Sequence, residues 1–139
     1  MKACNMTVDA IVIAYYRALA HADLAMLKVL MVPTSYYMTL EAVGVRLAFK
    51  DLEFREALKH IEESDKMLLS IEKRILEAGL IKKVMPVIAI KEVVKNGRER
   101  QTVLYEENGT AKKMYFSKED DGWKINYYAG RKIDKNDAL

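Results

Sequence analysis

Residues 93–125 decide the fold, and they read VVKNGRERQTVLYEENGTAKKMYFSKEDDGWKI. Two Asn-Gly pairs, Asn96-Gly97 and Asn108-Gly109, separate segments in which apolar and polar residues alternate. Asn-Gly is the strongest short-range signal of a β-hairpin, because both central residues of a type I′ turn need a positive φ. A looser third turn is expected at residues 119–122. The stretch therefore predicts four antiparallel strands in a meander.

Counting outward from these turns gives the expected register of the sheet. Two-residue loops place Ile90 opposite Val103 and Val103 opposite Met114. The third turn should pair Phe116 with Trp123. A slip of one residue would invert the two faces, so the hydrophobic pattern specifies the register. One apolar row should cross the four strands: Ile90, Val103, Met114 and Ile125.

The first half of the chain instead repeats its apolar residues at helical spacing. Pro33 should close the second helix, because proline cannot continue the hydrogen-bond ladder. Gly44 in mid-helix costs about 1 kcal/mol relative to alanine, so we expect a close contact there. Gly79 suits the position just after a helix end. The expected helix caps are, in order, Asn5 or Thr7, Asp23, Thr34 or Ser35, Asp51, and Ser64 or Asp65.

Length and composition fit one α+β domain. The chain has 139 residues, of which 51% are apolar, so a sizeable core is available. We expect a single domain over residues 1–139, with a helical part at 5–79, a sheet part at 80–131 and a short tail at 132–139. The helices should cover the apolar face of the sheet, because that face has to be buried.

Charge, cysteine content and hydropathy predict a cytoplasmic protein without nucleic-acid or membrane partners. The net charge is only +3, and the basic residues alternate with acidic ones instead of gathering on one face. Cys4 is the only cysteine, so no intrachain disulfide can form. The N-terminus lacks the apolar region of a signal peptide, and no apolar stretch is long enough to span a bilayer.

Helices followed by a meander that ends in Asp-Gly-Trp-Lys resemble the NTF2-like superfamily. The resemblance rests on residues 15–23, YYRALAHAD, and on residues 117–125, SKEDDGWKI. It implies a curved sheet wrapped over helices as a cone, with a pocket between them. The superfamily includes ketosteroid isomerase, scytalone dehydratase, limonene-epoxide hydrolase and many non-catalytic ligand-binding domains. Fold alone does not choose among these functions.

Tyr15 and Glu41 are the candidates for catalysis. Tyr15 stands eight residues before Asp23, where the resemblance to ketosteroid isomerase implies an oxyanion-stabilising tyrosine. Such chemistry also needs a carboxylate base. The expected strand at 87–94 offers no inward Asp, which leaves Glu41 for that role. A tyrosine on an apolar helix face usually belongs to the core, so the catalytic set is incomplete.

Two further groups of charged residues are expected to be structural, and no metal or cofactor is predicted. Glu56, His60 and Glu63 share one helix face, but such charged faces usually meet water. Asp51 and Arg46 have the residue types of the epoxide hydrolases' acid–base constellation. Their local spacing instead predicts a helix cap and a surface ion pair.

Aromatic and methionine side chains suggest a pocket for a small hydrophobic ligand with a polar end, because several hydroxyls should enter one apolar site. Simple core packing is the competing interpretation of the same residues. The alternative functions are an isomerase, dehydratase or hydrolase acting on a hydrophobic carbonyl-bearing substrate, and a non-catalytic structural or protein-interaction module. The expected ligand-binding residues are Tyr15, Tyr36, Tyr37, Met114, Phe116, Trp123 and Tyr127.

The outer face of the sheet predicts a homodimer. When one face of an antiparallel sheet is in solvent, every second residue along each strand lies on that face and should be polar. Here apolar and aromatic residues interrupt the Lys, Thr and Asn positions, and aromatic residues within a polar rim are typical of interface cores. The interrupting residues are Ala89, Val93, Leu104, Tyr115 and Tyr128.

Overall fold

The computed structural model describes residues 6–81 and 84–129. Cys4, the alternative cap Asn5 and the expected tail at 132–139 lie outside the described residues. No helix in the described part of the chain is long and apolar enough to cross a membrane. The elements are α1 (Val8–Ala20), α2 (Leu24–Leu30), α3 (Pro33–Lys50), α4 (Leu52–Lys59), α5 (Asp65–Glu77), β1 (Ile88–Lys95), β2 (Arg100–Glu107), β3 (Thr110–Glu119) and β4 (Gly122–Ile125).

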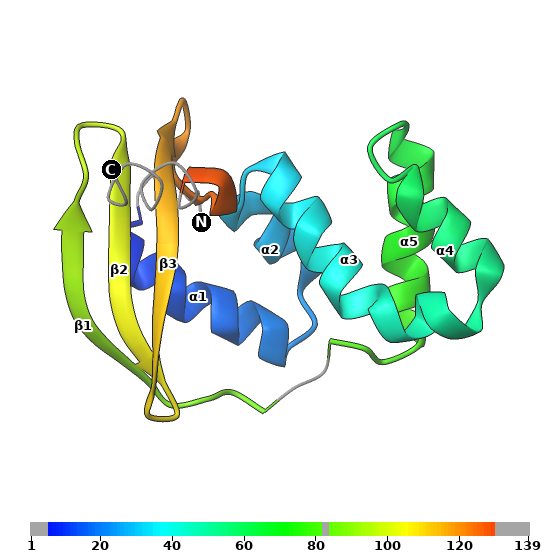
Figure 1. The fold of residues 1–139 in the computed structure, drawn as a ribbon, viewed down its shortest axis with the longest axis horizontal. Helices are drawn as coiled ribbons and strands as arrows, with labels where there is room; N and C mark the ends of the chain where they lie inside the picture. The colour runs from blue at the N-terminus through cyan, green and yellow to red at the C-terminus, as the bar shows by residue number, and fades with distance from the viewer. Residues whose placement is uncertain (1–5, 82–83, 130–139) are drawn as a thin grey trace, which may run out of the picture.

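The helices pack on an open, curved sheet whose strand order is β1-β2-β3-β4. Helix α1 packs against β1, β2 and β4, and α2 packs against β4. Helix α3 leads away from the sheet, and α4 and α5 pack on α3 at the far end of the molecule (Figure 1). The predicted α+β class is confirmed, with α1 and α2 as the helices that contact the sheet most.

The central hairpin has the predicted register. Val103 lies opposite Met114, and the turn between β2 and β3 is formed by Asn108 and Gly109. Asn108 has a φ of 50° and Gly109 a φ of 86°, as a type I′ turn requires. The Asn-Gly signal was therefore sufficient to place this pair of strands.

The first hairpin differs from the predicted pairing. Ile90 lies opposite Tyr105 instead of Val103, and Val93 occupies the position opposite Val103. The connecting loop spans residues 96–99 and is longer than the expected two-residue turn. Val93 consequently shares the inner face with Val103, although the alternation had placed it on the outer face.

Hydrogen bonds of Asn96 explain the longer loop. Its backbone N–H donates to the carbonyl of Arg100 at 3.0 Å, and its side-chain oxygen accepts from the Thr102 hydroxyl at 2.7 Å. A β-bulge between Ile90 and Glu92 then adds one residue to β1. A bulge of this kind shifts the alternation of faces. Ile90 thereby remains on the inner face.

The last hairpin is tighter than predicted. Phe116 lies opposite Ile125, and Trp123 lies opposite Lys118, so the predicted pairing of Phe116 with Trp123 is wrong. Because this error is an even number of residues, it leaves each side chain on its predicted face. Val103, Met114 and Ile125 are at most 4% exposed, whereas Ile90 at the edge of the sheet is 36% exposed.

Most of the helix caps agree with the sequence prediction. Thr7 is the N-cap of α1. The side chains of Asp23, Asp51 and Ser64 each accept a hydrogen bond from the backbone N–H of the third residue of the next helix. The caps predicted for α3 are wrong, because that helix begins at Pro33 with Val32 as its N-cap. Proline suits the first helical position, where its missing N–H leaves no bond unmade.

Two glycines occupy positions that a larger residue would strain. A Cβ at Gly44 would stand 3.0 Å from ring carbons of Phe54, so the predicted close contact is confirmed. Gly79 has a φ of 66° just beyond α5. The N–H of Leu80 then donates to the carbonyl of Ile75 at 3.3 Å, which completes a Schellman motif.

Residues 31–35 and 125–127 join the helical half to the sheet. The N–H of Val32 donates to the carbonyl of Ile125 at 3.0 Å. The N–H of Tyr127 donates to the hydroxyl of Ser35 at 3.0 Å, and Ser35 is fully buried. These bonds hold the start of α3 against the end of β4.

We expect the Ser35→Ala substitution to lower the free energy of unfolding by about 1–2 kcal/mol, because it leaves the Tyr127 N–H without its acceptor in a buried place. Urea unfolding followed by circular dichroism measures this. The matched control is Ser70→Ala, at an exposed position of α5. Equal effects of the two substitutions would contradict the role assigned to Ser35.

Candidate functional site

An apolar cleft of about 730 Å³ lies between α1, α3 and the segment that follows α5. This volume falls within the range of small-molecule sites in proteins. Tyr127, which follows β4, contributes to the same cleft. The lining residues are Tyr15, Leu19, Met38, Thr39, Ala42, Val43, Val45, Arg46, Gly79, Leu80, Ile81 and Tyr127.

Helix α3 supplies half of this lining. Met38, Ala42 and Arg46 follow one another at i, i+4 spacing and therefore share a face of the helix. The core-facing residues Tyr36 and Leu40 lie on a neighbouring face and are buried. None of the predicted ligand-binding residues lies on this face of α3. The apolar residues of α3 extend beyond a single row, and this pattern was the signal in the sequence for a second apolar face.

Tyr15 and Tyr127 place phenol groups at the cleft. Burial raises the pKa of Tyr15 far above its ordinary value, and the nearby Tyr127 phenol raises it further. Tyr15 is therefore a neutral phenol at physiological pH that interacts with the Tyr127 phenol, and the two hydroxyls together can bind a ligand oxygen. Its ring packs edge-on against Tyr16, with the centroids 5.0 Å apart.

Tyr16 belongs to a polar network beside the cleft. Its hydroxyl shares a hydrogen bond of 2.7 Å with the hydroxyl of Tyr105. Burial raises the pKa of Tyr16, and the neighbouring groups Tyr105 and Glu107 add to this effect. A smaller pocket of about 330 Å³ adjoins Tyr15 and Tyr16, and it contains the ion pair of Glu107 with Lys112 at 3.7 Å. Tyr15 thus lines both the apolar cleft and this polar pocket.

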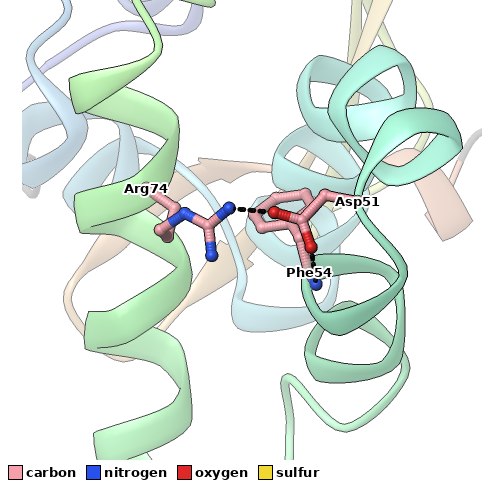
Figure 2. A network of polar contacts seen from close by, with 3 residues as sticks. All are labelled: Asp51, Phe54 and Arg74. Carbon is pink, nitrogen blue, oxygen red and sulfur yellow. Dashed lines mark hydrogen bonds and ion pairs between the residues drawn. The ribbon is translucent and has the colours of Figure 1, made fainter.

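A polar network of Asp51, Phe54 and Arg74 joins the start of α4 to α5 (Figure 2). The segment after α5 forms the cleft wall at 79–81. One carboxylate oxygen of Asp51 accepts from the Phe54 N–H at 3.0 Å, and the other accepts from the Arg74 guanidinium. The guanidinium carbon of Arg74 lies 5.6 Å from the centroid of the Phe54 ring. Asp51 is thus a cap as predicted, but the ion-pair partner is Arg74 and not Arg46.

The structure brings two of the seven predicted ligand-binding residues to the cleft, Tyr15 and Tyr127. Tyr36 is 1% exposed, and its hydroxyl donates to the carboxylate of Glu72 on α5. Tyr37 lies beside it, with the two ring centroids 6.4 Å apart.

The other three predicted ligand-binding residues belong to the sheet side of the molecule. Met114 and Phe116 are buried in the hydrophobic core. Trp123 is half-buried and packs against that core. Core packing, the competing interpretation of these residue types, describes the positions of all three.

Glu41 and His60 lie elsewhere, and the expected helix face of Glu56, His60 and Glu63 does not form, because α4 ends at Lys59. Glu41 is exposed on α3 and does not line the cleft with Tyr15. His60 shares a hydrogen bond of 2.7 Å with the exposed carboxylate of Glu63. Among the described residues, no three His, Cys, Asp or Glu side chains gather closely enough to hold a metal ion.

No protein-family model, curated protein or solved structure matches this chain. The fold and the cleft define an α+β protein with an apolar site that carries phenol groups and one guanidinium. The chemistry of the site therefore has to be inferred from its own residues.

The network around Asp51 predicts a specific dependence of stability on pH. The hydrogen bond from Phe54, and after it the bond from Arg74, lower the pKa of Asp51 below its ordinary value. The stabilisation is therefore fully present above the unfolded pKa of about 3.9 and is lost as the pH falls through the lower folded pKa. The difference in free energy of unfolding between the wild type and Asp51→Asn should be largest near neutral pH and should shrink below pH about 4.

Urea unfolding at a series of pH values measures this difference. In an Arg74→Gln background, the same Asp51→Asn substitution should have a smaller effect, because the ion pair is already absent. A difference that stays constant with pH would rule out an ionised Asp51 as the source of the stabilisation.

Proposed function

We propose that the chain is an NTF2-like domain that binds a small hydrophobic ligand in the cleft between α1 and α3. The single observation behind this proposal is the apolar cleft of about 730 Å³ with the phenols of Tyr15 and Tyr127 in its lining. Apolar pockets with a few polar groups are the usual form of small-molecule sites. The phenols would bind an oxygen of the ligand, and the aliphatic residues would bury its hydrocarbon part.

The order of the elements supports the NTF2-like assignment. Helices precede an antiparallel meander, and α1 packs across the inner face of the curved sheet. The segments 15–23 and 117–125 that carry the resemblance form the end of α1 and the last hairpin. A cytoplasmic location stays a prediction of the sequence.

Binding is favoured over catalysis, because the described residues of the cleft supply no carboxylate base. No Asp or Glu is among the described residues that line it. Tyr15 and Glu41, the catalytic candidates, do not face one cavity. Proton abstraction beside a carbonyl would need such a carboxylate within hydrogen-bond reach of the substrate. A structural or protein-interaction module does not require a cleft, whereas a ligand-binding domain does. Ligand binding therefore explains this feature better.

We expect an Ala42→Phe substitution to block the cleft. Ala42 lines the cleft from the exposed side of α3, so a larger side chain there fills the cleft without entering the core. Binding of the neutral apolar dye Nile red, followed by its fluorescence emission, should weaken at least about tenfold, because overfilled sites exclude ligand. Native mass spectrometry of the wild type should also detect a ligand retained from the expression host.

The matched control is Ala111→Phe, which places the same side chain at an exposed position of β3 that does not line the cleft. It should leave Nile red binding unchanged. If the wild type binds no dye, or if both variants bind it equally, the cleft is not the binding site.

We also propose a homodimer through the outer face of the sheet. The observed register places Val94 on that face, opposite Thr102, in place of the predicted Val93. Leu104 lies half-buried on the same face, opposite Lys113. Apolar residues within a rim of lysines suit the centre of an interface between two copies.

Sedimentation equilibrium of the wild type should give a dimer at micromolar concentration, and Leu104→Lys should shift it to monomer, because a charge is costly at an interface centre. Val29→Lys tests whether any new lysine has this effect, since Val29 is exposed on α2. A monomeric wild type, or a dimer that tolerates Leu104→Lys, would disprove this interface.

A further inference from the structure

Arg46 is the one charged residue among the described residues that line the cleft. The remaining lining residues are aliphatic, phenolic or uncharged polar, and none of those described is acidic. Arg46 forms no ion pair among the described residues, whereas Arg74 is paired with Asp51. The guanidinium of Arg46 is exposed on the C-terminal half of α3. A cation beside an apolar site, without a protein anion, favours a ligand that brings its own negative charge.

The positions along α3 give the cleft two different ends. Met38 and Arg46 are separated by about two helical turns, or about 12 Å along the helix axis. Thr39 lies near the tyrosine end, because Ser35, one turn before it, bonds the backbone of Tyr127. Arg46 lies on the opposite end of the same helix face. An elongated ligand can therefore place a charged group at Arg46 while its hydrocarbon part follows α3 toward the ring of Tyr127. A second oxygen at the far end of such a ligand would meet the phenols of Tyr15 and Tyr127.

We propose that the ligand is a hydrophobic monocarboxylate whose carboxylate is bound by Arg46. This inference rests on the proposed binding function and names its ligand class. The planar guanidinium matches a carboxylate with two parallel hydrogen bonds, which a lysine does not reproduce. Met38, Ala42 and Leu80 receive the hydrocarbon chain.

Three ligands with the same twelve-carbon chain distinguish the contribution of the headgroup to binding from that of the hydrocarbon chain. Dodecanoate, dodecanol and dodecylamine are each titrated, below their aggregation concentrations, into the wild type loaded with Nile red. Dodecanoate should displace the dye at the lowest concentration, and dodecylamine at the highest, because Arg46 repels an ammonium. Arg46→Gln should weaken the binding of dodecanoate about five- to tenfold, because Arg46 is exposed and its charge is screened by solvent. The same substitution should weaken the binding of dodecanol less than about twofold.

Two further variants control for charge and fold. Arg46→Lys keeps the charge without the planar guanidinium and should weaken the binding of dodecanoate by less than Arg46→Gln does. Arg55→Gln removes the same charge from an exposed position of α4 and should leave all three affinities unchanged.

The outcomes distinguish this inference from the proposed function. If dodecanol binds as tightly as dodecanoate, or Arg46→Gln weakens both equally, the carboxylate assignment is wrong and ligand binding stands. If none of the three ligands displaces the dye, and Ala42→Phe does not affect the dye either, the proposed function itself fails. A selective loss of dodecanoate in Arg46→Gln supports the assignment.

Discussion

The backbone junction between residues 31–35 and 125–127 is the constraint on which the rest of the structure depends. Each strand pairs with the next along the chain, and α2 to α5 pack largely on neighbouring helices, whereas α1 also packs across the sheet. Buried backbone groups have to find partners, and here the halves satisfy one another. Val32 bonds Ile125, and Ser35 bonds Tyr127. The same bonds bring Tyr127 to the cleft, so the site and the fold depend on one set of contacts.

Sequence reasoning succeeded where the deciding contact lies within a few residues. Asp23 and Asp51 cap helices through their own next turn, and Asn108-Gly109 closes a hairpin by its own backbone preference. The same dipeptide failed at Asn96-Gly97, because the hydroxyl of Thr102 binds the Asn96 side chain and the loop lengthens. The inner face stayed largely apolar because a β-bulge offset the shift at one hairpin and the other shift was even. The register errors therefore changed which residues pair, but they left most side chains on the predicted face of the sheet.

The candidate site was harder to predict than the sheet, because residue type does not separate a cleft from a core. Tyrosine and methionine bury apolar area in both places. Tyr36 and Tyr15 have the same chemistry, but Tyr36 meets Glu72 of α5, whereas Tyr15 faces the gap between α1 and α3. That difference depends on where α5 packs, some forty residues along the chain from Tyr36. The residues next to each tyrosine in the sequence therefore do not show which one packs in the core and which one lines the cleft.

The choice of partner at Asp51 separates the roles of two arginines, Arg46 and Arg74. In the sequence Arg46 is nearer to Asp51 than Arg74 is, but it lies five residues before Asp51 and lines the cleft on α3. Arg74 instead packs over the Phe54 ring and reaches the carboxylate from α5. This pairing holds α5, and therefore the cleft wall at 79–81, in place. Arg46 lines the cleft and has no acidic partner among the described residues. The two arginines therefore have different roles, because Arg74 joins α5 to the start of α4 and Arg46 supplies the positive charge of the described cleft lining.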